Sequence, residues 1–164
     1  MSNVVIPKWL IAAAATVAVI AVTPQIGFTA GDPPAPKCKG KDCKDHHDDA
    51  IYSLGYWQAK GGDYATALAT LRTARNQADP RIQTIIGFSL RKMGQVDEAI
   101  GYYMAALAKK PSLTTTRQYL GEAYLQKGEP GKAREQLAEI AKRCGTACED
   151  YAALAEEIAR FEKS

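Results

Sequence analysis

The strongest constraint on the fold is a pattern of small residues that occurs three times between residues 48 and 147. Each copy has a first glycine, a second glycine seven residues later and an alanine five residues after that. These positions are Gly55, Gly62 and Ala67, then Gly87, Gly94 and Ala99, then Gly121, Gly128 and Ala133. The copies are offset by 32 and 34 residues. Self-similarity at such a period is typical of repeat architectures, in which small units stack on their neighbours.

The spacing predicts that each copy is a pair of helices joined by a turn. The second glycine can adopt the left-handed conformation that ends a helix, and a lysine just before it complements the helix dipole. The first glycine and the alanine allow two helices to approach closely. Proline cannot continue a helix, so Pro80 and Pro111 mark boundaries between copies. We therefore predict an all-α fold with three helix pairs, over residues 48–79, 80–113 and 114–147.

The C-terminal segment, residues 148–164, predicts one further amphipathic helix. Tyr151, Leu154 and Ile158 follow helical spacing on one side, and charged residues lie on the other. Repeat arrays need a last helix with one polar side to cover their exposed core. We therefore expect this segment to be a capping helix.

The pattern resembles the tetratricopeptide repeat, a helix–turn–helix unit of 34 residues. The second copy, TIIGFSLRKMGQVDEAIGYYMAALAKKPSL, matches it best. In detail, residues 116–122 (TRQYLGE) and 144–151 (CGTACEDY) look like a group of small exported bacterial proteins with these repeats. The resemblance implies a right-handed solenoid that binds other proteins. It brings no catalytic residues with it.

The N-terminal 30 residues differ from the rest and predict an export segment. A run of fourteen residues from Trp9 to Val22 contains Thr16 as its only polar residue, after Lys8 and before Pro24. A short basic lead followed by such an apolar run is typical of a secretory signal peptide. A fourteen-residue helix is about 21 Å long, shorter than the roughly 30 Å hydrocarbon core. Retention as an inner-membrane anchor is the alternative, so we expect a periplasmic or secreted protein, or an anchored one facing the periplasm.

A stalk is predicted for residues 31–47, which are rich in proline, lysine and aspartate. The whole chain has 21 basic and 18 acidic residues and a net charge of +3. That charge is too small for a nucleic-acid-binding protein, which needs a concentrated basic face. Neither phosphate-binding nor hydrolase motifs occur, and both histidines lie in the stalk. We expect a non-enzymatic protein without a cofactor.

In the family that the chain resembles, the first helix of each pair lines a concave groove. Counting along each helix from the first glycine predicts which residues face it. The predicted partner-binding residues are Tyr52, Tyr56, Lys60, Arg81, Phe88, Arg91, Lys92 and Glu122. The middle of this groove would be aromatic and basic, which suits an extended peptide with acidic groups. The alternative is that the charges only solvate a helix face and the aromatic residues pack locally.

Four cysteines form two close pairs, Cys38 with Cys43 and Cys144 with Cys148. An even number in an exported chain favours disulfides. Three pairings are open, and proximity favours the two local ones. The alternative is a metal site of Cys38, Cys43, His46 and His47, although zinc sites usually have a shorter gap between cysteines. A metal-binding or redox function of the stalk, with the repeats as a spacer, is accordingly the second functional hypothesis beside the protein-interaction scaffold.

Overall fold

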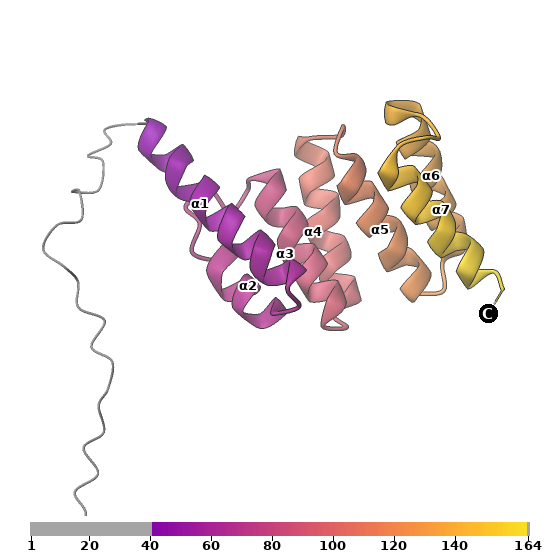
Figure 1. The fold of residues 1–164 in the computed structure, drawn as a ribbon, viewed down its shortest axis with the longest axis horizontal. Coiled ribbons are helices and arrows are strands. Elements are labelled where there is room, and N and C mark those ends of the chain that lie inside the picture. The colour runs from indigo at the N-terminus through magenta and orange to yellow at the C-terminus, as the bar shows by residue number, and fades with distance from the viewer. Residues whose placement is uncertain (1–40, 164) are drawn as a thin grey trace, which may run out of the picture. The chain divides into compact units, whose positions relative to one another are not determined.

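The computed structural model describes residues 41–163, which form seven α-helices and no strand. Figure 1 shows these helices in a row, with α1 at one end and α7 at the other. Their bounds are α1 Lys41–Lys60, α2 Tyr64–Leu71, α3 Pro80–Lys92, α4 Val96–Lys109, α5 Thr114–Gln126, α6 Pro130–Cys144 and α7 Glu149–Phe161. The predicted all-α solenoid of three helix pairs and a final helix is confirmed.

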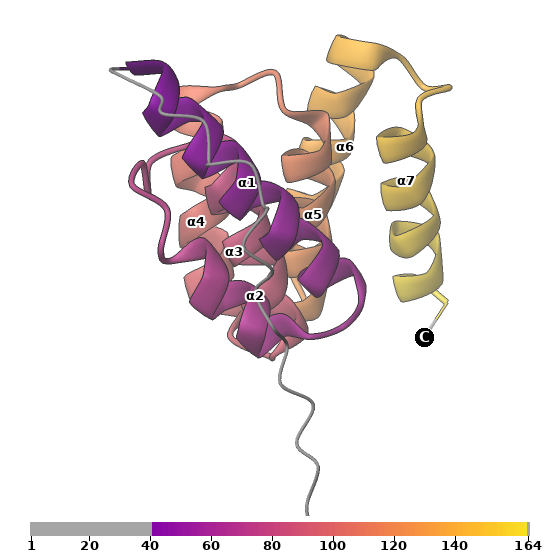
Figure 2. The ribbon, with the colours of Figure 1, turned by 60° about the vertical axis from the view of Figure 1, so that its left-hand side comes forward.

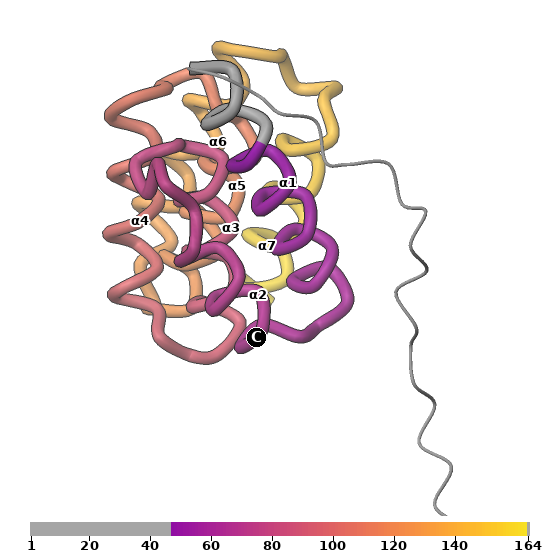
Figure 3. The backbone as a smooth tube through the Cα atoms, turned by 90° about the vertical axis from the view of Figure 1, so that its left-hand side faces the viewer, coloured from indigo at the N-terminus to yellow at the C-terminus, as the bar shows by residue number. Residues whose placement is uncertain are grey.

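The helices form two layers. α1, α3 and α5 each pack against the even-numbered helix that follows, and each pair packs against the next. Viewed along the row in Figure 3, α4 lies on one side of the molecule and α1 on the other. Figure 2 shows α7 following α5 and α6 as the first helix of a further pair would. It packs against both of them.

Turns within the pairs occur at the second glycines, as predicted. Gly62, Gly94 and Gly128 have φ angles of 88°, 85° and 74°, a region that residues with a Cβ rarely adopt. Proline begins two helices, one at the start of a pair and one within a pair, since Pro80 and Pro130 lie in the first turns of α3 and α6. An amide donor is not needed there. Local chemistry therefore sets both the turns and the helix starts.

Close contact between helices explains the first glycine of each copy. A Cβ atom built on Gly87 would lie 2.6 Å from Cε1 of Tyr103, which is fully buried on α4. In the third copy the corresponding neighbour of Gly121 is Leu154 of α7. The buried apolar residues form one cluster over α1 to α5 and a second where α5, α6 and α7 meet.

The N-terminal end of α1 lies earlier than the boundary inferred from the sequence. This helix begins at Lys41, so the last seven residues of the predicted stalk are helical. No proline occurs after position 36 until Pro80, which leaves this stretch free to extend the helix. The predicted export segment, residues 1–30, lies outside the described residues. Within residues 41–163, no helix is long and apolar enough to cross a membrane.

Candidate functional site

Two neighbouring cavities lie on the face formed by the odd-numbered helices. The first has a volume of about 320 Å³ and is lined by α1, α3, α5 and the residues just before α5. The second has a volume of about 400 Å³ and is lined by α3, α5 and α7. Both cavities share α3 and α5, so they are consecutive parts of one surface. We call this surface the groove.

The first cavity is mainly aromatic and aliphatic. Tyr52 and Tyr56 of α1 form one wall, with ring centroids 6.0 Å apart. Ile85, Leu113 and Tyr119 contribute from α3, the α4–α5 connection and α5. Such a lining can accept an apolar side chain.

Polar groups around the first cavity are already paired with one another. The Arg81 guanidinium lies 2.7 Å from carboxylate oxygens of both Asp49 and Asp79. The hydroxyls of Thr84 and Thr116 lie 2.7 Å apart and join α3 to α5. Arg81 also lies over the Tyr52 ring, 5.2 Å from its centroid. The two carboxylates outweigh the single cation of Arg81, so this cluster offers no positive charge to a ligand.

Aromatic rings of α2, α3 and α5 pack against one another, and Tyr119 among them lines the first cavity. The Phe88 ring lies 4.9 Å from that of Tyr119 and 6.0 Å from that of Tyr64, measured between centroids. Burial raises the pKa of Tyr119 to about 12, and the nearby Glu122 carboxylate adds to the effect. Burial also raises the pKa of the Tyr103 hydroxyl below it. These tyrosines are neutral at physiological pH, so the charge of the groove comes from its lysines, arginines and glutamates.

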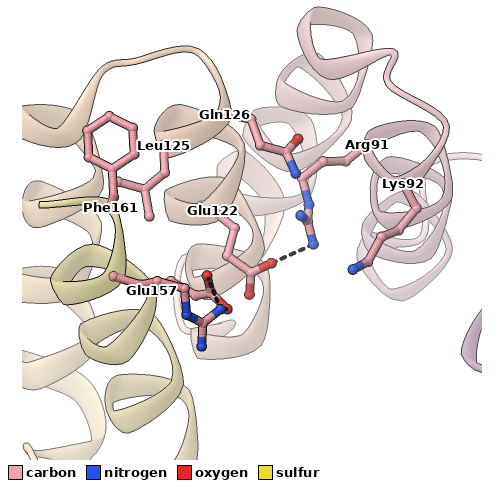
Figure 4. Close-up of a pocket in the computed structure, with 8 residues that line it drawn as sticks. Arg91, Lys92, Glu122, Leu125, Gln126, Glu157 and Phe161 are labelled. Atoms are coloured by element: carbon pink, nitrogen blue, oxygen red, sulfur yellow. Dashed lines mark hydrogen bonds and ion pairs between the residues drawn. The ribbon is translucent and has the colours of Figure 1, made fainter. Parts of the chain in front are cut away.

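The second cavity has a buried ion pair at its base. Arg91 of α3 and Glu122 of α5 approach to 2.6 Å, with side chains that are 3% and 17% exposed. Figure 4 shows the two side chains pointing toward each other, with Lys92 beside them. Across the cavity, Arg160 of α7 pairs with Glu157 of the same helix at 2.9 Å. Lys92 makes no ion pair with any residue that the structure describes.

Removing the negative partner of Arg91 is expected to destabilise the protein. In E122Q the buried guanidinium loses its counter-charge but keeps an amide oxygen as an acceptor. We expect a loss of about 1 to 2 kcal/mol in the free energy of unfolding, measured by urea denaturation at neutral pH. The matched control is E157Q, whose ion pair with Arg160 is exposed and should contribute almost nothing. Equal stability of the two variants would contradict a buried pair between α3 and α5.

Six of the eight predicted groove residues line the two cavities, whereas Lys60 and Phe88 line neither. Tyr52, Tyr56 and Arg81 line the first cavity, and Arg91, Lys92 and Glu122 line the second. Phe88 and Arg91 are buried, at 9% and 4% exposure. Lys60 lies over the Tyr56 ring, 5.9 Å from its centroid. The basic character inferred for the middle of the groove is thus reduced, since Arg81 and Arg91 are both paired with carboxylates.

Sequence reasoning missed two sets of lining residues. Ile85 and Tyr119 lie two positions before the first glycines Gly87 and Gly121, an offset that the helical count omitted. Side chains of α7 were missed because that helix was treated only as a cap. The apolar spacing of α7 matches that of the first helix of a repeat and could have indicated that its side chains reach the groove. The α7 residues lining the second cavity are Glu157, Arg160 and Phe161.

Two of the four cysteines form a disulfide, between Cys144 and Cys148 at the connection of α6 and α7. This is one of the two local pairs that proximity favoured. Cys38 and the side chains of Cys43 and His46 lie outside what the structure describes. The remaining member of the alternative metal site, His47, places Nδ1 3.1 Å from Oδ1 of Asp48. Among the described residues, no group of three or more potential ligands is placed to hold a metal ion.

Several solved structures are similar in fold. One is the type III secretion translocator chaperone SycD of Yersinia enterocolitica, with 22% identity and a TM-score of 0.61, covering 70% of this chain and 83% of that one. The structure of the same chaperone in complex with a peptide of the translocator YopD has 22% identity and a TM-score of 0.59. The match covers 70% of this chain and 88% of that one. The structure of PcrH in complex with the chaperone-binding region of PopB has 17% identity and a TM-score of 0.57. The match covers 75% of this chain and 97% of that one. At these identities the likeness shows the fold alone.

The comparison with curated proteins finds no significant match. Family models do match the chain, and both describe the tetratricopeptide repeat. One covers residues 49–79 and the other residues 90–158. The second match includes most of α7, in agreement with the packing of that helix as part of the repeat array. The chain belongs to the tetratricopeptide repeat family.

Proposed function

We propose that the protein is a non-enzymatic scaffold that binds an extended segment of a partner protein along the groove. The observation that carries this proposal is the pair of adjoining cavities on the face of the odd-numbered helices. An extended peptide can place successive side chains into separate pockets along such a surface. Two of the structures similar in fold are chaperones in complex with a segment of their partner, which supports the same mode of binding.

Lysines at equivalent repeat positions support a partner with acidic groups. Lys60 and Lys92 each lie five residues after a first glycine. Each lies over an aromatic ring of the same helix, at 5.9 Å from the centroid of Tyr56 and 5.7 Å from that of Phe88. Neither makes an ion pair with a described residue. Their charges are therefore available to carboxylates on a ligand, while the first cavity accepts an apolar side chain.

An envelope setting is part of the same proposal, and so is kinship with small exported bacterial proteins of this family. The apolar run near the N-terminus, before the repeats, supports it. The disulfide between Cys144 and Cys148 also supports it, because such bonds persist in oxidising compartments.

Selection from a library of random extended peptides tests the binding mode. We expect the selected peptides to combine an acidic residue with a large apolar one. Their affinity, measured by fluorescence anisotropy, should fall at least about tenfold in K92E, because an attraction becomes a repulsion close to the ligand. The matched control is K109E. Lys109 is exposed at the end of α4, away from the groove, and its substitution changes the net charge equally.

Equal weakening by K92E and K109E would contradict the proposal, since it would reduce the effect to the overall charge of the protein. Selected peptides without acidic residues would contradict the acidic part alone. In that case Y56A tests whether the peptides still bind in the first cavity, which Tyr56 lines. A lower affinity would support the groove as the binding surface, and an unchanged affinity would contradict it.

A further inference from the structure

The first cavity of the groove favours an apolar ligand group over an acidic one. Arg81 is the one charged residue among those that line it. The carboxylates of Asp49 and Asp79 each lie 2.7 Å from its guanidinium. An acidic ligand group would meet more negative than positive charge there, and like charges oppose binding. This cavity therefore suits an apolar residue of a ligand.

The second cavity offers a positive charge that the protein does not balance. Three cations line it, those of Arg91, Lys92 and Arg160. Arg91 is paired with Glu122, and Arg160 is paired with Glu157. Lys92 is exposed and has no carboxylate partner within the part of the chain that the structure describes. Figure 4 shows it beside the pair of Arg91 and Glu122. An acidic residue of a ligand is therefore favoured at this second cavity.

The two cavities are displaced from each other along the helices. On α3, the residues that line the second cavity lie about eight positions after those that line the first, and the same holds on α5. At 1.5 Å per residue, this displacement is about 12 Å toward the C-terminal ends of the two helices.

The cavities are also displaced across the row of helices. α1, α3 and α5 line the first cavity, whereas α3, α5 and α7 line the second, so the centre moves by one odd-numbered helix. α3 and α5 are in contact, and the axes of packed helices lie about 10 Å apart. Combining the two displacements at right angles gives a distance of about 16 Å between the cavities, along a diagonal of the groove.

This distance sets the spacing between the two ligand groups. An extended chain rises about 3.3 Å per residue, so about 16 Å corresponds to about five residues. Side chains alternate between the two faces of such a chain, and only an even separation points two of them into the same surface. Four is the even number closest to the distance. We propose that the partner segment crosses the groove diagonally and carries a large apolar residue and an acidic residue four positions apart. This inference rests on the proposed function and adds the path and the spacing of the segment.

Peptides that differ only in this spacing test the proposal. The host is the tightest peptide selected from the random library, with all but one of its acidic residues replaced by serine. Its apolar residue stays in place, and the acidic residue is moved to positions one to eleven residues away, on either side. On at least one side, we expect the tightest binding at a separation of four. Separations of one and two should bind about fivefold more weakly at low ionic strength, because only one residue reaches its cavity at a time. Fluorescence anisotropy with the whole chain measures this.

Three variants assign the two ends of the path. K92Q should remove the preference, so that all peptides of the series bind about equally. K109Q is the matched control on α4, away from the groove, and should keep the preference. Y56A should weaken all peptides to a similar extent, since Tyr56 lines the cavity that would hold the apolar residue. Lys92 and Lys109 are exposed, so circular dichroism should show unchanged helix content in both lysine variants.

Failure of this inference is distinguishable from failure of the proposed function. Binding that Y56A weakens but that shows no preference for spacing overturns the diagonal path and leaves the groove as the binding surface. An optimum near ten positions also overturns it, because a helical segment rises only 1.5 Å per residue and needs about ten residues to cover the distance. A preference that K60Q removes and K92Q keeps would place the acidic residue at the end of α1 instead. If no peptide binds, the proposed function fails and this inference fails with it.

Discussion

Replacing Gly87 with leucine is expected to destabilise the protein strongly. Gly87 lies in the middle of α3, and its missing side chain leaves room for Tyr103 of α4. A Cβ at this position would lie 2.6 Å from Cε1 and 2.9 Å from Cδ1 of that ring. The ring cannot turn away, because Tyr103 is fully buried in the centre of the core. α3 and α4 would therefore have to separate.

The expected loss for G87L is about 3 kcal/mol or more in the free energy of unfolding, as for severe overpacking of a core. This loss arises although leucine favours a helix over glycine by about 1 kcal/mol. Urea denaturation followed by circular dichroism measures it. Gly87 and Tyr103 belong to the central repeat. A separation of α3 and α4 should therefore weaken the packing of the core toward both α1 and α5.

G101L is the matched control for that measurement. Gly101 lies within α4, and a Cβ there would meet no atom within 4 Å. The same substitution should leave the stability unchanged or raise it slightly through helix propensity. If G87L were as stable as G101L, the close approach of α3 and α4 would be refuted.

The positions of the helices were predictable because their determinants are local. Gly94 ends α3 and Pro130 begins α6 through backbone properties that act within one turn. The repeated pattern then extends each assignment to the other copies. The predicted start of α1 was wrong. The prolines that forbid a helix all lie before residue 41, and residues 41–47 share only the charged composition of the predicted stalk, which permits a helix.

The site was less predictable because its chemistry depends on pairs that are distant in the sequence. Helical counting predicted that both Arg91 and Glu122 lie in the groove, but it could not predict the ion pair that joins them between α3 and α5. It therefore treated the charge of Arg91 as available to a ligand. Likewise, α7 carries groove residues only because it packs against α5, and that follows from the array as a whole.

Asp48 shows the same limit of local reasoning and carries the second large effect. Along the sequence it is one of several acidic residues beside the cysteines and histidines of the stalk. In the structure it is buried and holds the connection between α2 and α3. Its two carboxylate oxygens accept hydrogen bonds from the backbone amides of Arg75 and Asn76, each at 2.9 Å. This one side chain therefore ties α1 to the segment that connects α2 and α3.

D48A is expected to lower the free energy of unfolding by about 3 kcal/mol at neutral pH, because two backbone donors lose a charged acceptor. The matched control is D49A. Asp49 is the neighbouring residue, but it is exposed, and Arg81 retains Asp79 as a partner when it is removed. That substitution should cost less than about 1 kcal/mol. Similar losses in D48A and D49A would contradict the anchoring role of Asp48.

The pH dependence of stability provides a separate readout of the same contact. Burial alone would raise the pKa of Asp48, but hydrogen bonds from the amides of Arg75 and Asn76 and from His47 outweigh it and lower the pKa below its usual value. A carboxyl group with a lowered pKa in the folded state stabilises the protein above its unfolded pKa of about 4. This contribution is lost as the pH falls through the folded value. Between neutral pH and pH 3, wild type should therefore lose more stability than D48A in urea denaturation, whereas equal losses would show that the carboxylate is not held in this way.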